Sequence, residues 1–353
     1  MRDRTRKTAL AVGGFLVAAA VVAVILYGRG TGPAPPTAES DAEESALLAA
    51  SHGLVWRDGA GLHLLVKTGE ELVLSDHQQC GDLPCAPVLA TRYRYAGWDA
   101  RIGGYLLQVS MGRTQAMVLT YGDDEPALLD ARHAADADAP QPIPESRPVA
   151  TKTDDSLAEW LAGLESDREQ SESPLRAKWP EQASRQGGSL TLSLADRRHL
   201  QLVDDLVCGQ LACPPQISRS FDFAGESPDG RFHIVQQEWN EAEEGLLVDR
   251  TGDVLETLSV PSFAPDGHVA VAVISDLEAA APRRLEVWNL AGAKPSLAFS
   301  VPAKDEDDTI YELVAWVDAT HLRLKRGAWG SDRRTQVMLV QDEAGWHIEV
   351  GDL

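Results

Sequence analysis

The segment that decides the fold is residues 60–87, AGLHLLVKTGEELVLSDHQQCGDLPCAP, because it returns 128 positions later as residues 188–215, GSLTLSLADRRHLQLVDDLVCGQLACPP. The two copies align without a gap, and the alignment continues through residue 119 of the first copy. Both place leucines at alternate positions and contain the pattern Cys-Gly-x-Leu-x-Cys, at Cys80–Cys85 and Cys208–Cys213. Chance rarely aligns so many positions, so the sequence predicts an internal duplication.

Short runs of alternating apolar and polar residues fill both copies and continue toward the C-terminus. They include residues 62–66, 72–74, 190–194, 200–202, 269–273, 285–288, 322–324 and 337–340. Period-two alternation bounded by Gly, Asp and Pro indicates half-buried strands. Many short strands in a duplicated chain predict an all-β sandwich, barrel or propeller. The shift of 128 divides into three units of about 43 residues, which is the length of a propeller blade.

A turn motif favours the propeller among these folds. Ser227-Pro-Asp-Gly-Arg231 is followed by the apolar run at 232–235, and Ala264-Pro-Asp-Gly-His268 is a weaker copy. Pro presets φ, Asp caps its own backbone, and Gly supplies the positive φ that a turn between strands requires. The motif resembles the S-P-D-G-[KR] turn of TolB-type, WD-like β-propeller repeats, chiefly over residues 215–300. The resemblance implies a β-propeller.

We therefore expect residues 46–353 to form an exported β-propeller of about six blades, with seven as the alternative. Residues 1–29 are expected to form a cytoplasmic stub and a transmembrane anchor, and residues 30–45 a flexible polar spacer. Residues 131–185 are expected to be an insert that replaces a blade, first rich in Pro, Ala and Asp and then helical.

The helix of this insert is expected over residues 156–166. Ser156 and Glu159 form a capping-box pattern, and one face carries an apolar stripe of Leu157, Trp160, Leu161 and Leu164. This stripe either packs against the propeller or docks a partner.

The N-terminus predicts the compartment. Four basic residues within residues 2–7 precede 19 apolar or uncharged residues, 9–27, long enough to cross a bilayer. A cleavable signal peptide is the alternative, but its apolar region is usually shorter and ends in a small-residue cleavage site. The basic flank places the N-terminus in the cytoplasm and the main domain in the periplasm or outside the cell. We expect a single-pass protein of the inner (plasma) membrane.

The charge of the chain restricts its partners. The 353 residues include 32 basic and 54 acidic side chains, giving a formal net charge of −22. Nucleic-acid binding requires a basic surface, so this composition argues against it. An acidic domain is also repelled by anionic lipid, so only the N-terminal anchor is expected to touch the membrane. The expected partner is another envelope protein.

The four cysteines lie in the exported part, where an even number of them indicates disulfides. A turn containing Gly81 or Gly209 can bring each pair together, so we expect local bridges, Cys80–Cys85 and Cys208–Cys213. A zinc site or free thiols are the alternatives. Such short loops remove little chain entropy, so each bridge should stabilise by at most about 2 kcal/mol. We expect each to pin a turn.

The sequence indicates no catalytic, cofactor-binding or metal-binding residue. It contains no G-x-S-x-G elbow and no H-E-x-x-H, and its acidic runs at 241–244 and 304–308 lack the order of a calcium loop. Three tryptophans in turn-like contexts either pack or contact a partner: Trp98, Trp239 and Trp329. An interaction or scaffold module is therefore the preferred function. The alternatives are a glycosidase or lyase with carboxylates in the propeller channel, and a ligand-binding sensor.

Overall fold

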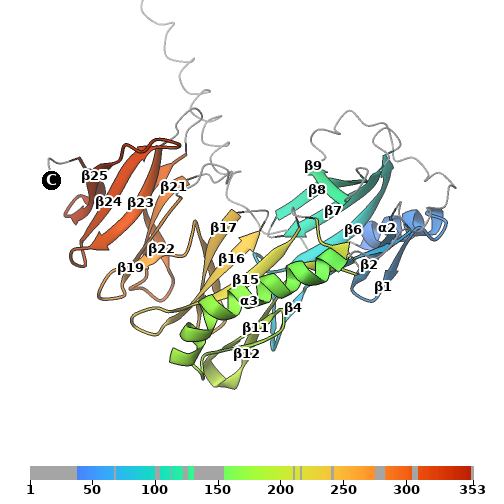
Figure 1. Ribbon diagram of the computed structural model, residues 1–353, viewed down its shortest axis with the longest axis horizontal. Helices are drawn as coiled ribbons and strands as arrows, with labels where there is room; N and C mark the ends of the chain where they lie inside the picture. Colours follow the sequence, from blue (N-terminus) through green and yellow to red (C-terminus); the bar gives the residue numbers. More distant parts are fainter. Residues whose placement is uncertain are drawn as a thin grey trace, which may run out of the picture.

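A computed structural model describes residues 38–66, 69–99, 104–111, 113–121, 126–130, 155–209, 211–214, 217–239, 242–274, 283–303 and 309–350. Small antiparallel β-sheets make up most of this part (Figure 1). None of the helices within these residues is long and apolar enough to span a membrane. The expected anchor, residues 9–27, lies outside the described residues.

Six sheets of three or four antiparallel strands follow one another in chain order. The first half contains β1 (Val55–Asp58), β2 (Gly61–Leu65) and β3 (Glu71–Ser75), then β6 (Thr91–Asp99), β7 (Gly104–Met111), β8 (Arg113–Tyr121) and β9 (Pro126–Asp130). The second half contains β10 (Ala183–Gln186), β11 (Ser189–Ser193) and β12 (His199–Val203), then β15 (Arg219–Glu226), β16 (Phe232–Trp239), β17 (Ala242–Asp249) and β18 (Val254–Thr257).

Two further sheets complete the chain. They contain β19 (Ser262–Phe263), β20 (Val269–Val273), β21 (Arg283–Asn289) and β22 (Ser296–Pro302), then β23 (Thr309–Trp316), β24 (His321–Ala328), β25 (Thr335–Asp342) and β26 (Gly345–Glu349). Within every sheet, each strand pairs with the next one along the chain. The expectation of an all-β domain built from short antiparallel strands is confirmed.

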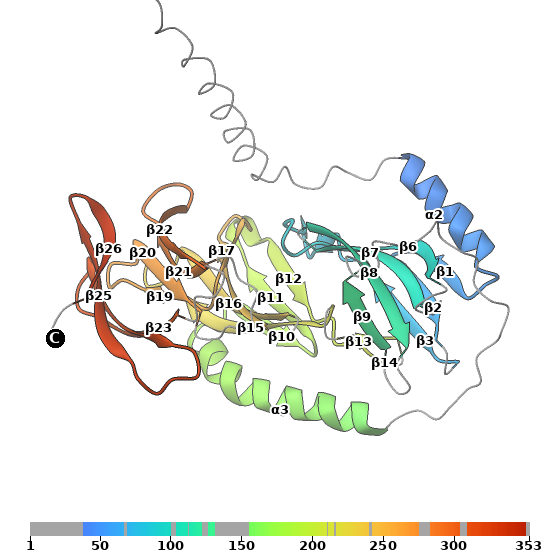
Figure 2. The same cartoon turned by 90° about the horizontal axis from the view of Figure 1, so that it is seen from above.

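The first and last of these sheets lie at opposite ends of an elongated molecule (Figures 1 and 2). A propeller ring brings its first and last blades side by side. Closure of the six sheets into a ring is therefore not seen among the described residues.

The duplication extends to the arrangement of the elements. Helix α2 (Ala38–Ala50), shifted by 128, coincides with the end of helix α3 (Asp155–Lys178). Each half then continues with a three-stranded sheet, a small hairpin of two strands with two residues each, and a four-stranded sheet. The same β-bulge interrupts both four-stranded sheets, at Gly97 and at Gly225, with φ of 126° and 122°.

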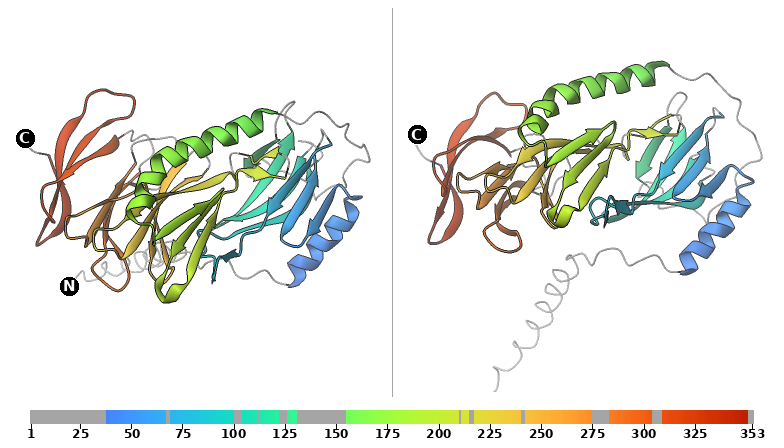
Figure 3. Two further views of the ribbon diagram at one scale, coloured as in Figure 1. Left: turned by 60° about the horizontal axis from the view of Figure 1, so that its bottom comes forward. Right: turned by 90° about the horizontal axis from the view of Figure 1, so that it is seen from below.

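Both helices differ from the sequence-based boundaries. The spacer expected over residues 30–45 is shorter, because residues from Ala38 onward belong to α2 and Glu44 is buried there. Helix α3 continues twelve residues beyond the expected end at 166, because its later turns hold the buried Glu172. It runs along one long side of the molecule (Figure 3), and its early turns leave Trp160 44% exposed.

The turn at 227–231 has the local geometry that its residues predict. Ser227 Oγ donates to Asp229 Oδ1 at 2.7 Å and accepts from the Phe232 N–H at 3.0 Å, while Gly230 has φ of 68°. The weaker copy has its own left-handed glycine, Gly267, with φ of 74°. These turns connect β15 to β16 and β19 to β20.

Candidate functional site

Each cysteine pair forms a disulfide within its own hairpin. Cys80 bonds to Cys85 and Cys208 to Cys213, with Cα atoms 4.8 and 4.9 Å apart. The bridges close two small hairpins, formed by β4 (Gln79–Cys80) with β5 (Leu83–Pro84) and by β13 (Val207–Cys208) with β14 (Leu211–Ala212). The prediction of two local disulfides is confirmed.

Each disulfide hairpin packs against the opposite half of the molecule. Cys80 belongs to the apolar core of the second half, which is built around Leu190 and Leu192. Cys208 and Cys213 belong to the core of the first half. The two halves therefore exchange hairpins, so the bridges stabilise the joint between the halves as well as pinning a turn.

The geometry of the exchange, which is the same in both halves, depends on two glycines with left-handed backbone. Gly81 has φ of +70°, and a Cβ there would lie 2.7 Å from the backbone oxygen of His199 on β12. Gly209 has φ of +78°, and its Cβ would lie 2.7 Å from the backbone oxygen of Glu71 on β3. Since His199 and Glu71 are also 128 positions apart, the two contacts are equivalent. Any larger residue would push each hairpin off its strand.

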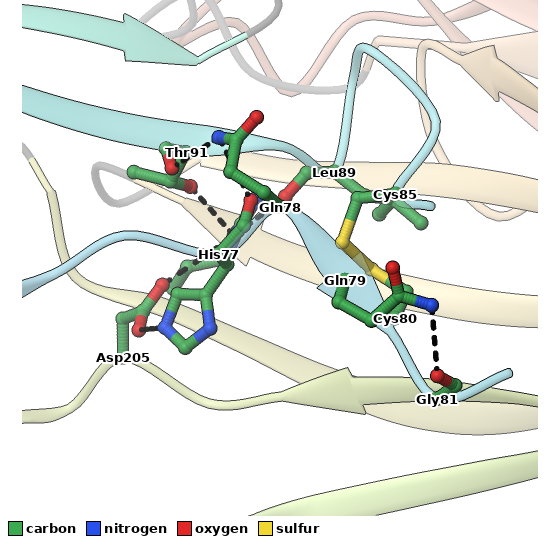
Figure 4. Close-up of a disulfide and its surroundings, with 10 residues drawn as sticks. His77, Gln78, Gln79, Cys80, Gly81, Cys85, Leu89, Thr91 and Asp205 are labelled. Carbon is green, nitrogen blue, oxygen red and sulfur yellow. Dashed lines mark hydrogen bonds and ion pairs between the residues drawn. A yellow bond between two sulfur atoms is a disulfide. The ribbon is translucent and has the colours of Figure 1, made fainter. Parts of the chain in front are cut away.

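The centre of the joint is a cluster of polar side chains. His77 Nε2 lies 2.6 Å from Asp205 Oδ1, and an Arg219 Nη2–H donates to Thr91 Oγ1 at 2.9 Å (Figure 4 shows the first pair). In both pairs the partners are 128 positions apart. Equivalent residues meet only at a two-fold axis, so this cluster marks the axis that relates the two halves.

The joint leaves little room for a ligand. Arg219, which is 3% exposed, also lies 3.4 Å from Asp205 Oδ2 and donates to the Leu89 carbonyl oxygen at 3.0 Å. The adjacent gap has a volume of about 10 Å³, enough for one water. The cluster can join the halves, but it has no space for a substrate.

A buried Glu–Arg–Asp network flanks the joint in each half. It consists of Glu44, Arg57 and Asp76 in the first half and Glu172, Arg185 and Asp204 in the second, each residue 128 positions from its counterpart. Its carboxylates also accept from backbone N–H groups of the following four-stranded sheet. The network therefore ties the helix, the small sheet and the large sheet of each half together.

In the second network the contacts of Glu172 are shorter than those of Glu44 in the first, whereas Arg185 lies 3.6 Å from Asp204. Arg185 Nε donates to Glu172 Oε2 at 2.7 Å, and the Phe223 N–H donates to Glu172 Oε1 at 2.7 Å. Arg168 Nη1 donates to Asp204 Oδ2 at 2.7 Å, and the Phe221 N–H donates to Asp204 Oδ1 at 2.9 Å. The arginines and carboxylates of this network neutralise one another's charge, which indicates that the network has a structural role.

Burial raises the pKa of Asp204 to about 6, and Arg168 and Arg185 only partly oppose this effect. The folded protein thus binds the Asp204 proton more tightly than the unfolded chain does. This contribution to stability is complete below pH 4 and is lost as the pH rises through about 6. We expect Asp204→Asn to remove up to roughly 3 kcal/mol of this pH dependence. Denaturant unfolding of both proteins between pH 4 and 7 measures it, and parallel pH profiles would contradict it.

The three tryptophans singled out from the sequence have different surroundings. Trp98 packs against the core of the first half, with its ring 5.1 Å from that of Tyr105. Trp239 is half-buried at the end of β16, and Trp329 is 43% exposed between β24 and β25. The structure does not bring the three together, and Trp329 has the most exposed position.

A second cavity, of about 290 Å³, lies between α3 and the small sheet of the second half. Its lining includes Arg168, Arg176 and Arg185, and each of these forms ion pairs with acidic side chains. The described residues contain no cluster of three metal-binding side chains. The acidic run at 304–308 lies outside the described residues, which resume with β23 at Thr309.

The comparisons with known proteins leave the family open. Neither a protein-family model nor a curated protein matches the chain. Among solved structures, the chain is similar to prolyl oligopeptidase B from Galerina marginata bound to a macrocyclization substrate, with 11% identity and a TM-score of 0.27. The similarity covers 75% of this chain and 32% of that one, so the chain spans about a third of its length.

Proposed function

We propose that the chain is a single-pass envelope protein whose exported β domain is a protein-interaction or scaffold module. In this proposal residues 9–27 cross the inner (plasma) membrane, the N-terminus is cytoplasmic, and the domain binds another envelope protein. The two disulfides support an oxidising compartment for the domain.

The observation that carries the interaction role is the position of the exposed apolar side chains. Leu297 on β22, Val314 on β23 and Val317 directly after β23 are 38%, 47% and 51% exposed and lie in the region of the last two sheets. Those sheets lie beyond the duplicated halves, at the end of the molecule opposite α2 (Figure 1). Exposed apolar side chains grouped in one part of a soluble domain are typical of a protein interface. We place the partner-binding surface on these sheets.

We further propose that the six sheets are blade-type units of the TolB-type, WD-like class. Their consecutive antiparallel order and the two Pro-Asp-Gly turns support this proposal. The units form an open series. The exchanged hairpins join the first half of this series to the second half. Such a series gives an extended scaffold.

A double substitution, Val314→Ser with Val317→Ser, is expected to reduce partner recovery at least about tenfold, because buried interface side chains dominate affinity. The measurement is cross-linking in native membranes followed by purification of the full chain. Trp160→Ser is the control, since Trp160 is equally exposed but lies on α3. Unchanged recovery in the double variant, or loss only in Trp160→Ser, would contradict this surface.

The membrane topology is tested separately: a reporter fused at Leu353 must stay outside the cytoplasm.

A further inference from the structure

The β24–β25 hairpin reverses the charge of the rest of the chain. Residues 323–334 contain five basic side chains and one acidic side chain, Asp332, in a chain with 32 basic and 54 acidic residues. The five are Arg323, Lys325, Arg326, Arg333 and Arg334. This local excess is large enough to create a positive surface on an acidic domain.

Only two of these basic groups are neutralised by a described acidic residue. Lys325 Nζ lies 3.6 Å and Arg334 Nε 3.1 Å from the carboxylate of Glu312 on β23. Arg323, Arg326 and Arg333 are exposed and have no ion pair with an acidic residue among the described residues. Within the part of the chain that the structure describes, these three guanidinium groups therefore have no acidic partner.

An exposed tryptophan lies among these arginines. Trp329 follows β24 directly, is 43% exposed, and precedes Gly330, which has φ of +69°. The turn thus combines an aromatic ring with cationic groups before and after it. Tryptophan prefers the bilayer–water interface, where its ring contacts acyl chains and its N–H remains solvated.

We propose that the β24–β25 hairpin docks on the anionic phospholipid headgroups of the membrane that holds the N-terminal anchor. The inference rests on the anchor of the proposed function. Arginine forms paired hydrogen bonds with phosphate oxygens, and each uncompensated arginine near an anionic surface strengthens binding about fivefold. The rest of the acidic domain is repelled, so contact is confined to this hairpin. This proposal differs from the expectation that only the anchor touches the membrane.

The hairpin and the anchor attach the domain to the membrane at different places. The hairpin lies at the end of the molecule opposite α2, the first described element after the anchor (Figure 1). The anchor acts as a tether that raises the effective concentration of the hairpin at the membrane, so the contact is stronger there than on a separate vesicle. Two attachment points at opposite ends hold the long axis of the domain along the membrane.

The test uses the full chain in nanodiscs of neutral phosphatidylcholine, so that the anchor is already embedded. These nanodiscs are mixed with sedimenting vesicles of phosphatidylcholine containing about 30% phosphatidylglycerol, and bound protein is measured. We expect partitioning to the anionic vesicles that falls steeply at about 0.5 M salt. Combined Arg323→Ser, Arg326→Ser and Arg333→Ser substitutions should weaken it about 100-fold, and Trp329→Ser about tenfold.

The matched control removes three positive charges elsewhere, by Arg197→Ser, Arg198→Ser and Lys294→Ser, and should retain full partitioning. Equal binding to neutral vesicles, absence of binding, or equal loss in both triple variants would overturn the proposal. Arginine-dependent binding to soluble polyglutamate without vesicle binding would overturn it too, in favour of an acidic protein. Failure of the chain to remain in nanodiscs would instead overturn the anchor, and thus the proposed function.

Discussion

Replacing Glu172 with alanine is expected to lower the free energy of unfolding of the β domain by about 3–5 kcal/mol. Glu172 is 1% exposed and holds Arg185 and the Phe223 N–H, which would both lose a buried partner. Removing one member of a buried ion pair leaves an uncompensated charge, and this accounts for the size of the effect. Denaturant unfolding with intact disulfides measures it.

The control for this substitution lies one helical turn away. The side chain of Glu169 is 64% exposed and pairs with Arg176, so Glu169→Ala should change stability by less than about 1 kcal/mol. Glu172→Gln keeps the shape but removes the charge, so its effect should be intermediate. Equal stability of the Glu172→Ala and Glu169→Ala proteins would show that the Glu–Arg–Asp network does not hold the helix on the sheets.

Gly81→Ala is expected to destabilise the domain by about 3 kcal/mol or more. The added Cβ meets a backbone oxygen of the opposite half at 2.7 Å, and the left-handed conformation itself costs alanine about 1–2 kcal/mol. The hairpin must move off β12, and its buried apolar contacts are lost with it. Gly209→Ala should have the same effect from the other side of the axis.

Gly187→Ala separates these two contributions. Gly187 also has a left-handed backbone, with φ of +55°, but an added Cβ has no neighbour within 4 Å. Its alanine variant should therefore show only the conformational cost, about 1–2 kcal/mol. Thermal unfolding of the three variants measures the difference. If Gly81→Ala and Gly187→Ala proved equally stable, the contact between the halves would contribute nothing.

Much of this architecture can be predicted from the sequence. Alternating leucines such as Leu62 and Leu64 fix strand positions, because one face of each strand must be buried. The spacing of Cys80 and Cys85 predicts a local bridge, since a turn between them suffices to close it. The turn at 227–231 is predicted because Pro, Asp and Gly each restrict one part of its backbone.

The exchange of the hairpins could not be predicted, because it depends on which surface each hairpin contacts. A hairpin packed on its own half would have the same alternation and the same cysteine spacing. A signal for the buried networks was present, however, since Glu44, Arg57 and Asp76 recur at a shift of 128. Alignment from residue 60 onward omits the first two of these positions. Repeated charged residues within a duplicated apolar pattern indicate buried ion pairs.

The two halves form one body by exchanging disulfide hairpins. The most direct test inserts a site-specific protease sequence between Asp130 and Asp155, cleaves the folded protein, and measures whether the two fragments elute together. We predict that they remain associated in the wild-type background and separate when Gly81→Ala and Gly209→Ala are combined. Separation of the wild-type fragments on cleavage, with both disulfides intact, would show that the exchanged hairpins do not hold the two halves together.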